Sequence, residues 1–241
     1  SAASAVRMGT PTGRWVVAAA ALGSGITLLD GTVVNVALRT IGEDLDASLA
    51  ELQWINNGYL LTLASLILLG GSLGDRFGRR RLFVVGTVWF ALASLLCGLA
   101  PTAETLVVAR LLQGVGGGLL TPGSLAMIQG AFVREDRAPA IGAWSGFGGI
   151  AAAIGPFLGG ALIDAASWRW IFLVNLPIAV VTIWIAQRHV PESRSTTPST
   201  HFDVVGAGLA MVALGGTTYA LIQWGGAVAS VAGLVGVAAA V

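Results

Sequence analysis

The stretch LQWINNGYLLTLASLILLGGSLGDRFGRRRLFVVGTVWFALASLLCGLA, residues 52–100, consists of two apolar runs with a short arginine-rich segment between them. The runs cover residues 52–73 and 82–100. A helix that crosses a bilayer needs about 20 mostly apolar residues, and each run has about that length. The charged segment between them cannot enter hydrocarbon without a large cost in free energy. The stretch therefore predicts two membrane-spanning helices joined by a tight turn.

Further apolar runs of similar length occur in the rest of the chain, and they predict an all-α polytopic membrane protein. Charged residues make up 10% of the sequence and apolar residues 55%, whereas soluble domains contain about 25% charged residues. So little polar surface excludes a water-soluble globule and makes nucleic acid an unexpected partner. The additional predicted spans lie near residues 15–38, 105–128, 139–163, 170–187, 204–223 and 225–241.

Arginines outside the spans indicate the orientation, because positively charged residues resist translocation. With the amino terminus inside, ten arginines fall in cytoplasmic segments and only Arg39 and Arg169 in outer loops. We therefore expect a multi-pass protein of the cell membrane. Its parts are a cytoplasmic amino terminus (1–14), a six-helix bundle (15–187), a polar cytoplasmic connector (188–203) and two additional helices (204–241). Because the sequence ends inside an apolar run, we expect a missing carboxy-terminal bundle to follow.

Two ionisable residues lie inside predicted spans, Asp30 in the first and Arg110 in the fourth. At about 1.5 Å per residue, Asp30 lies about 22 Å beyond Trp15 from the cytoplasmic side, and Arg110 about 8 Å beyond Thr105 from the outer side. In a hydrocarbon core about 30 Å thick, the two residues share nearly the same depth. A charge facing lipid is costly, so each must face the bundle interior, a water-filled cavity or the other.

These two residues are the candidate proton-coupling site. Burial and a nearby guanidinium act on the protonation of Asp30 in opposite directions, which would make it a usable proton switch. Arg110 remains charged and would bias Asp30 or attract an anion. A structural ion pair, or a carboxylate that caps a broken helix near Gly31, is the alternative. Asn35 and Gln113, in the same two helices, are candidates for a substrate cavity, although ordinary hydrogen bonds between helices explain them equally well.

The turn between the second and third spans, GGSLGDRFGRRR at residues 70–81, carries a pattern that positive charge alone does not explain. It resembles the loop signature of the major facilitator superfamily, matched by Gly71, Asp75, Arg76, Gly78, Arg79 and Arg80. The resemblance implies that the aspartate meets a helix terminus of the other half of the protein and latches a cytoplasmic gate, which suits a negative group at a helix amino terminus.

Three further stretches are similar to the fourteen-helix drug:proton antiporter branch of that superfamily. LDGTVVNVAL (29–38) contains Asp30 and Asn35, and RLLQGVGGG (110–118) contains an arginine that the resemblance links to proton transfer. Arg39 stands where the branch usually has proline, and Ala151 where it usually has glycine. The fifth span resembles the antiporter motif of exporters at Gly142, Gly155, Pro156, Gly159 and Gly160.

The resemblance implies a six-helix amino-terminal bundle plus two additional helices. It also implies a secondary transporter that exports hydrophobic or cationic drugs or antibiotics in exchange for protons. An exporter or importer of one metabolite, and a truncated fragment that transports nothing, are the alternatives. The sequence contains no P-loop, nucleophile–base set or metal-ligand cluster, so we expect neither an enzyme nor a cofactor.

Overall fold

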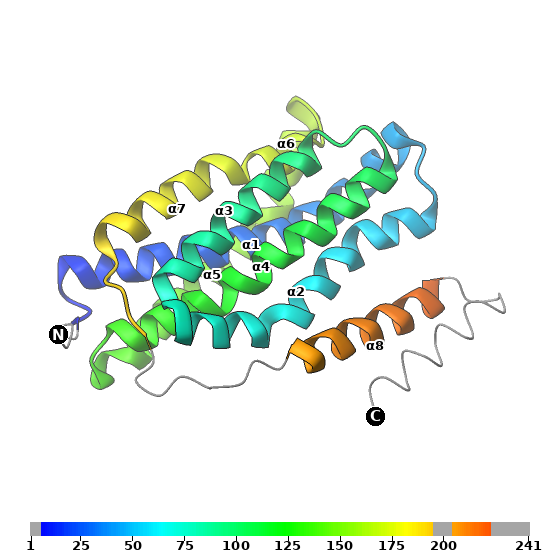
Figure 1. The fold of residues 1–241 in the computed structure, drawn as a ribbon. Helices are drawn as coiled ribbons and strands as arrows, with labels where there is room; N and C mark the ends of the chain where they lie inside the picture. Colours follow the sequence, from blue (N-terminus) through cyan, green and yellow to red (C-terminus); the bar gives the residue numbers. More distant parts are fainter. Residues whose placement is uncertain (1–5, 195–203, 223–241) are drawn as a thin grey trace.

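The fold is a bundle of long, roughly parallel helices (Figure 1). The computed structural model describes residues 6–194 and 204–222. In this part of the chain, six helical segments are long and apolar enough to cross a membrane. The elements are α1 (Pro11–Leu45), α2 (Leu49–Phe77), α3 (Arg79–Gly98), α4 (Ala103–Ala131), the 3-10 helix η1 (Arg134–Asp136), α5 (Arg137–Ala165), α6 (Trp170–Leu173), α7 (Asn175–His189) and α8 (Val204–Ile222).

The helices extend beyond the apolar runs because local signals, and not hydropathy, decide where they end. Ser48 accepts a hydrogen bond from the Glu51 backbone, and the Glu51 carboxylate accepts one from Ser48, which makes a capping box at the start of α2. Thr102 and Thr105 form the equivalent box at the start of α4. Between α2 and α3 a single residue, Gly78, makes the turn with φ of 113°.

Small residues bring the central helices together. α4 packs against both α2 and α3, and a Cβ at Gly116 would lie 2.6 Å from the backbone nitrogen of Phe90 on α3. A Cβ at Gly114 would overlap the Thr62 hydroxyl of α2. Such close backbone approach is typical of membrane helices, which have no hydrophobic drive to associate in lipid.

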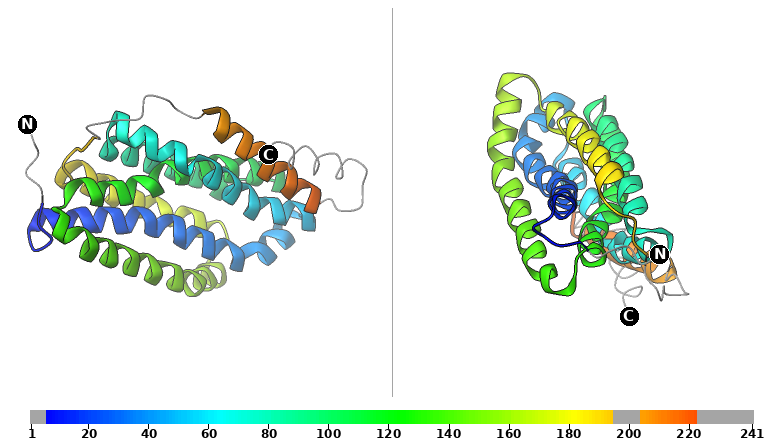
Figure 2. Two further views of the ribbon diagram at one scale, coloured as in Figure 1. Left: turned by 90° about the horizontal axis from the view of Figure 1, so that it is seen from below. Right: turned by 90° about the vertical axis from the view of Figure 1, so that its left-hand side faces the viewer.

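α5 stands at one side of the bundle and packs mainly on α1 (Figure 2). Its other side chains are open to the surroundings, with Phe157 81% exposed. α8 packs along α2, and it occupies the predicted span 204–223. The predicted span 225–241 and residues 195–203 of the connector lie outside the described residues.

The sixth predicted span, residues 170–187, corresponds to the helical segment Trp170–His189, which is long and apolar enough to cross a membrane. Within it, α6 ends at Leu173 and α7 begins at Asn175, and Val174 between them keeps helical backbone angles. Pro177 has no N–H, so the Leu173 carbonyl cannot accept the helical hydrogen bond from that position. A hydropathy window cannot detect this break in the backbone hydrogen bonds, because Pro177 lies within an otherwise apolar segment.

Candidate functional site

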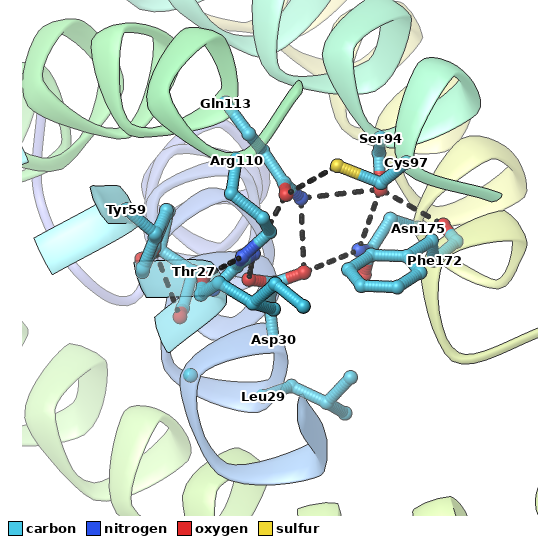
Figure 3. A network of polar contacts seen from close by, with 12 residues as sticks. Thr27, Leu29, Asp30, Tyr59, Ser94, Cys97, Arg110, Gln113, Phe172 and Asn175 are labelled. Atoms are coloured by element: carbon cyan, nitrogen blue, oxygen red, sulfur yellow. Dashed lines mark hydrogen bonds and ion pairs between the residues drawn. The ribbon is translucent and has the colours of Figure 1, made fainter. Parts of the chain in front are cut away.

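A network of polar side chains lies in the middle of the bundle (Figure 3). Asp30 of α1 and Arg110 of α4 are both fully buried, and Arg110 Nη1 donates to Asp30 Oδ2 at 2.5 Å. The structure thus brings together the two charges that the sequence placed at one depth. Removing one partner of such a buried pair typically costs about 3–5 kcal/mol, because it leaves an uncompensated charge.

The second oxygen of the Asp30 carboxylate accepts hydrogen bonds from two amides. Gln113 Nε2 lies 2.9 Å and Asn175 Nδ2 3.1 Å from Asp30 Oδ1. The same two nitrogens also approach Ser94 Oγ, at 3.2 and 3.0 Å. Asp30 on α1 is therefore connected to α3, α4 and α7. Every group around the carboxylate is a donor, which is the arrangement that an ionised carboxylate requires.

Arg110 is held by groups on α2 and α4 in addition to Asp30. Its Nε donates to the Ile55 carbonyl at 3.1 Å, and its Nη1 donates to Gln113 Oε1 at 2.6 Å. The guanidinium carbon lies 4.2 Å from the centre of the Tyr59 ring, a cation–π geometry. The charge therefore has polar and aromatic partners although no solvent reaches it.

Sequence reasoning missed several members of this network. The sequence analysis did not predict Ser94, Tyr59, Cys97 or Asn175 as members. Cys97 is buried, but its Sγ also lies 3.4 Å from Gln113 Oε1. Ser94 and Asn175 carried one usable signal, since each is a polar residue inside an apolar run.

The two predicted cavity residues are not brought together in the described part of the chain. Gln113 is fully buried in the charge network. Asn35 is exposed, donates to the Gly31 carbonyl at 2.8 Å and accepts from Asn56 Nδ2 at 3.2 Å. It is five residues from Asp30, about 140° around the helix. Asn35 therefore faces away from the network.

The arginine-rich turn is organised by ion pairs at one end of the bundle. Arg79 Nη2 lies 2.7 Å from Asp75 Oδ1, and Arg79 Nη1 donates to the Ala126 carbonyl of α4 at 3.3 Å. The Glu192 carboxylate, which was not predicted, accepts from the Arg80 backbone N–H at 3.1 Å and lies 3.7 Å from its guanidinium. The start of the predicted connector is thereby tied to this turn. Of the other predicted members, a Cβ at Gly71 would approach no atom more closely than Pro122 at 3.9 Å, and Arg76 lies 5.6 Å from the Phe77 ring centre.

Two of the predicted glycines of α5 form its contact with α1, beside Asp30. A Cβ at Gly155 would overlap the Thr32 hydroxyl, and one at Gly159 would lie 3.4 Å from Val33. Gly142 and Gly160 face open space within the described residues, with nothing within 4 Å of an added Cβ. Pro156 lies inside α5. The predicted glycines thus divide into a contact face and an open face.

A cavity of about 770 Å³ lies along α1 and α5. Arg14 is the one charged residue among the described residues that line it, and Leu29 of its lining is the chain neighbour of Asp30. The remainder of the wall is predominantly apolar, including Val17 and Ala21 of α1 and Phe147, Ile150 and Ile154 of α5. The cavity is of a size found for small-molecule sites, which are about 300–1,000 Å³.

Comparisons with known proteins agree with this architecture. A family model described as Major Facilitator Superfamily matches residues 20–241. The chain is 40% identical over 213 residues to a methylenomycin A resistance protein of Bacillus subtilis (strain 168), covering 88% of this chain and 45% of that protein. It is 41% identical over 233 residues to the multidrug efflux pump LfrA of Mycolicibacterium smegmatis, covering 96% of this chain and 45% of the pump.

Among solved structures, the fold is similar to a bacterial homologue of the human lysosomal transporter Spinster in an inward-facing and occupied conformation. The TM-score is 0.64 at 22% identity, covering 96% of this chain and 59% of that one. The chain spans less than half the length of the two curated relatives, at 45% of each.

Proposed function

The chain belongs to the major facilitator superfamily, and from that premise we propose that it is the amino-terminal half of a proton-coupled exporter of hydrophobic drugs or antibiotics. Protons would move inward through Asp30 while the substrate moves outward by alternating access. The relatives support export, since one confers resistance to an antibiotic and another is an efflux pump.

The observation that carries the proposal is the fully buried Asp30–Arg110 pair. Inside a membrane an ionisable residue is expensive, and such residues commonly mark ion pathways. Asp30 can exchange a proton, whereas Arg110 stays charged and stabilises the ionised carboxylate. Binding a proton would neutralise Asp30 and weaken the contacts that connect α1 to α3, α4 and α7. This gives the bundle two charge states with different internal bonds.

The apolar cavity beside Asp30 supports a hydrophobic substrate. Its wall offers surface for dispersion contacts, and few polar groups that would select one chemical structure. Small apolar differences discriminate weakly between ligands. A site of this kind would accept several lipophilic compounds, with a second wall contributed by the carboxy-terminal half.

Two features of the packing, the Asp75–Arg79 pair at one end and the glycine contact between α5 and α1, fit alternating access. We propose that the end carrying Asp75 and Arg79 lies in the cytoplasm, as the distribution of arginines predicts. Asp75 and Arg79 would then form the gate contact with the other half. The glycine contact between α5 and α1 would permit the small relative movements that rocking needs, because no large side chains interlock there.

The test is the exchange Asp30→Asn in the complete protein. After susceptibility profiling has identified a transported compound, its efflux is measured in vesicles under an imposed pH gradient. We expect Asp30→Asn to abolish gradient-driven efflux. Asp44→Asn is the matched control, because Asp44 lies on the same helix but is 47% exposed and pairs with Arg169 outside the network. Unchanged efflux in Asp30→Asn would reject the role of Asp30.

A second candidate is an exporter dedicated to one antibiotic, favoured by the relative that confers methylenomycin A resistance. The same susceptibility profile separates the two, because a dedicated exporter would protect against one chemical class only. Reversed substrate movement under the same gradient would indicate an importer, and no movement of any compound would indicate a protein that does not transport.

A further inference from the structure

Asn175 lies beside a break in the backbone hydrogen bonds of the sixth span, and its side chain points into the charge network (Figure 3). It is the first residue of α7 and is fully buried. Its neighbour in the network, Ser94, also donates to the carbonyl of Phe172, in α6, at 2.9 Å. The network therefore contacts the chain on both sides of this break, where Pro177 leaves the Leu173 carbonyl without its helical hydrogen bond.

Only the nitrogen of the Asn175 side-chain amide forms hydrogen bonds. Nδ2 donates to Asp30 Oδ1 and to Ser94 Oγ, whereas Oδ1 is buried with no hydrogen-bond partner among the residues the structure describes. If the Asn175 amide were rotated by 180°, its oxygen would face a carboxylate oxygen, and two acceptors cannot form a hydrogen bond. An ionised Asp30 therefore requires the orientation in which Asn175 Nδ2 faces it. A buried carbonyl oxygen without a donor is unfavourable.

A protonated Asp30 would need an acceptor at this position. When a hydronium ion gives up a proton to Asp30 Oδ1, the new O–H group needs an acceptor, which Asn175 Nδ2 cannot supply. Gln113 has no free acceptor to offer, because its Oε1 already accepts from Arg110 Nη1 at 2.6 Å and contacts Cys97 Sγ at 3.4 Å. Among the buried side-chain amides of the described residues, only the Asn175 oxygen is without a donor.

We propose that Asn175 is a positioning residue that transmits the protonation of Asp30 to α7 by rotating its amide; this rests on the proposed function. In the ionised state Nδ2 donates to Asp30, and in the protonated state Oδ1 accepts from it. The hydroxyl of Ser94 then turns from the Phe172 carbonyl toward the amide oxygen. Hydrogen bonds change on both sides of the break, and α7 changes its angle to α1 and α3.

Asp30 has few ionisable neighbours in this network. They are Arg110 from α4, Tyr59 from α2 and Cys97 from α3. No second carboxyl group lies in this network within the described residues. The proposal therefore assigns proton uptake to the Asp30 carboxylate.

The experiment follows the end of α7 in the complete protein, reconstituted in lipid nanodiscs. A bimane label is attached at Arg188→Cys, an exposed site in the last turn of α7, while Cys97 is buried and inaccessible. Any cysteines of the carboxy-terminal half are replaced by serine. Fluorescence is recorded from neutral to acidic pH, with no ligand required. We expect a pH-dependent change that Asn175→Leu abolishes and that Asp30→Asn holds at its acidic value.

Thr182→Val is the matched control, because Thr182 is also a buried polar residue of α7 but donates only to Ile178 within its own helix. It should keep the response. If Asn175→Leu fails to fold, Asn175→Ser, whose side chain is too short to reach Asp30, should also lose the response. A full response in the folded Asn175 variant, or an equal loss in Thr182→Val, overturns the inference and leaves the proposed function intact. A response that persists in Asp30→Asn would instead reject Asp30 as the proton site.

Discussion

The buried Asp30–Arg110 pair allows a quantitative prediction about stability. Arg110→Met leaves the Asp30 charge with two amide donors and no counter-ion, and we expect a loss of about 3–5 kcal/mol. Asp30→Asn leaves the guanidinium with two carbonyl-type acceptors and the Tyr59 ring, and we expect about 3 kcal/mol for the same reason. In the double variant both charges are absent, and the main losses are the hydrogen bonds from Arg110 to the Ile55 carbonyl and to Gln113 Oε1, worth about 1 kcal/mol each.

The double variant should therefore be far more stable than the sum of the single changes predicts. The coupling is measured as a double-mutant cycle, by reversible unfolding of the complete protein in mixed micelles of mild detergent and dodecyl sulfate. Tryptophan fluorescence reports unfolding, and all four proteins are compared at one pH. Two results would refute the description of Asp30 and Arg110 as a mutually compensating buried pair. Either the losses in free energy of unfolding of the two single variants add up in the double variant, or each single loss is under about 1 kcal/mol.

Two further predictions compare pairs of glycines. Gly78→Ala should cost about 1–3 kcal/mol in the same unfolding assay, because φ of 113° disfavours a side chain and the added Cβ would lie 2.8 Å from the Glu192 carboxylate. Gly74→Ala, whose added Cβ would meet its nearest neighbour at 3.6 Å, should cost nothing or stabilise. Equal effects at both positions would contradict a strained turn. Gly155→Val should cost about 1–3 kcal/mol by overpacking against α1 and should reduce efflux. Gly160→Val, which faces open space, should change neither, and a loss there would argue that the open face has a contact in the complete protein.

The fold followed from the sequence because its main determinants are local. Runs of about 20 apolar residues give spanning helices wherever they occur, and the predicted spans within the described residues correspond to helices. The depth of Asp30 and Arg110 also followed, since the helical rise per residue is constant. Their partnership could be expected once both were at one depth, and the structure confirms that they meet.

The rest of the site depends on how the helices rotate and pack, which spacing along the chain does not reveal. Asn175 is 145 residues from Asp30, and only the tertiary fold brings their side chains together. Asn35 shared a helix with Asp30 but lies on another face, so its inclusion in a cavity with Gln113 stays a prediction for the complete protein. Glu192 was hidden because a polar connector gives no sign of which residue returns to a helix end.

The single-residue junction at Gly78 fixes the rotation of α3 relative to α2. With no slack between them, inserting one amino acid there would turn α3 by about 100° about its own axis. Ser94, although four helical turns away, would then swing out of reach of Asn175. A peptide tag or a linker inserted at this turn would therefore remove the contact between Ser94 and Asn175 in the buried network, whereas the same insertion in a longer loop would leave it in place.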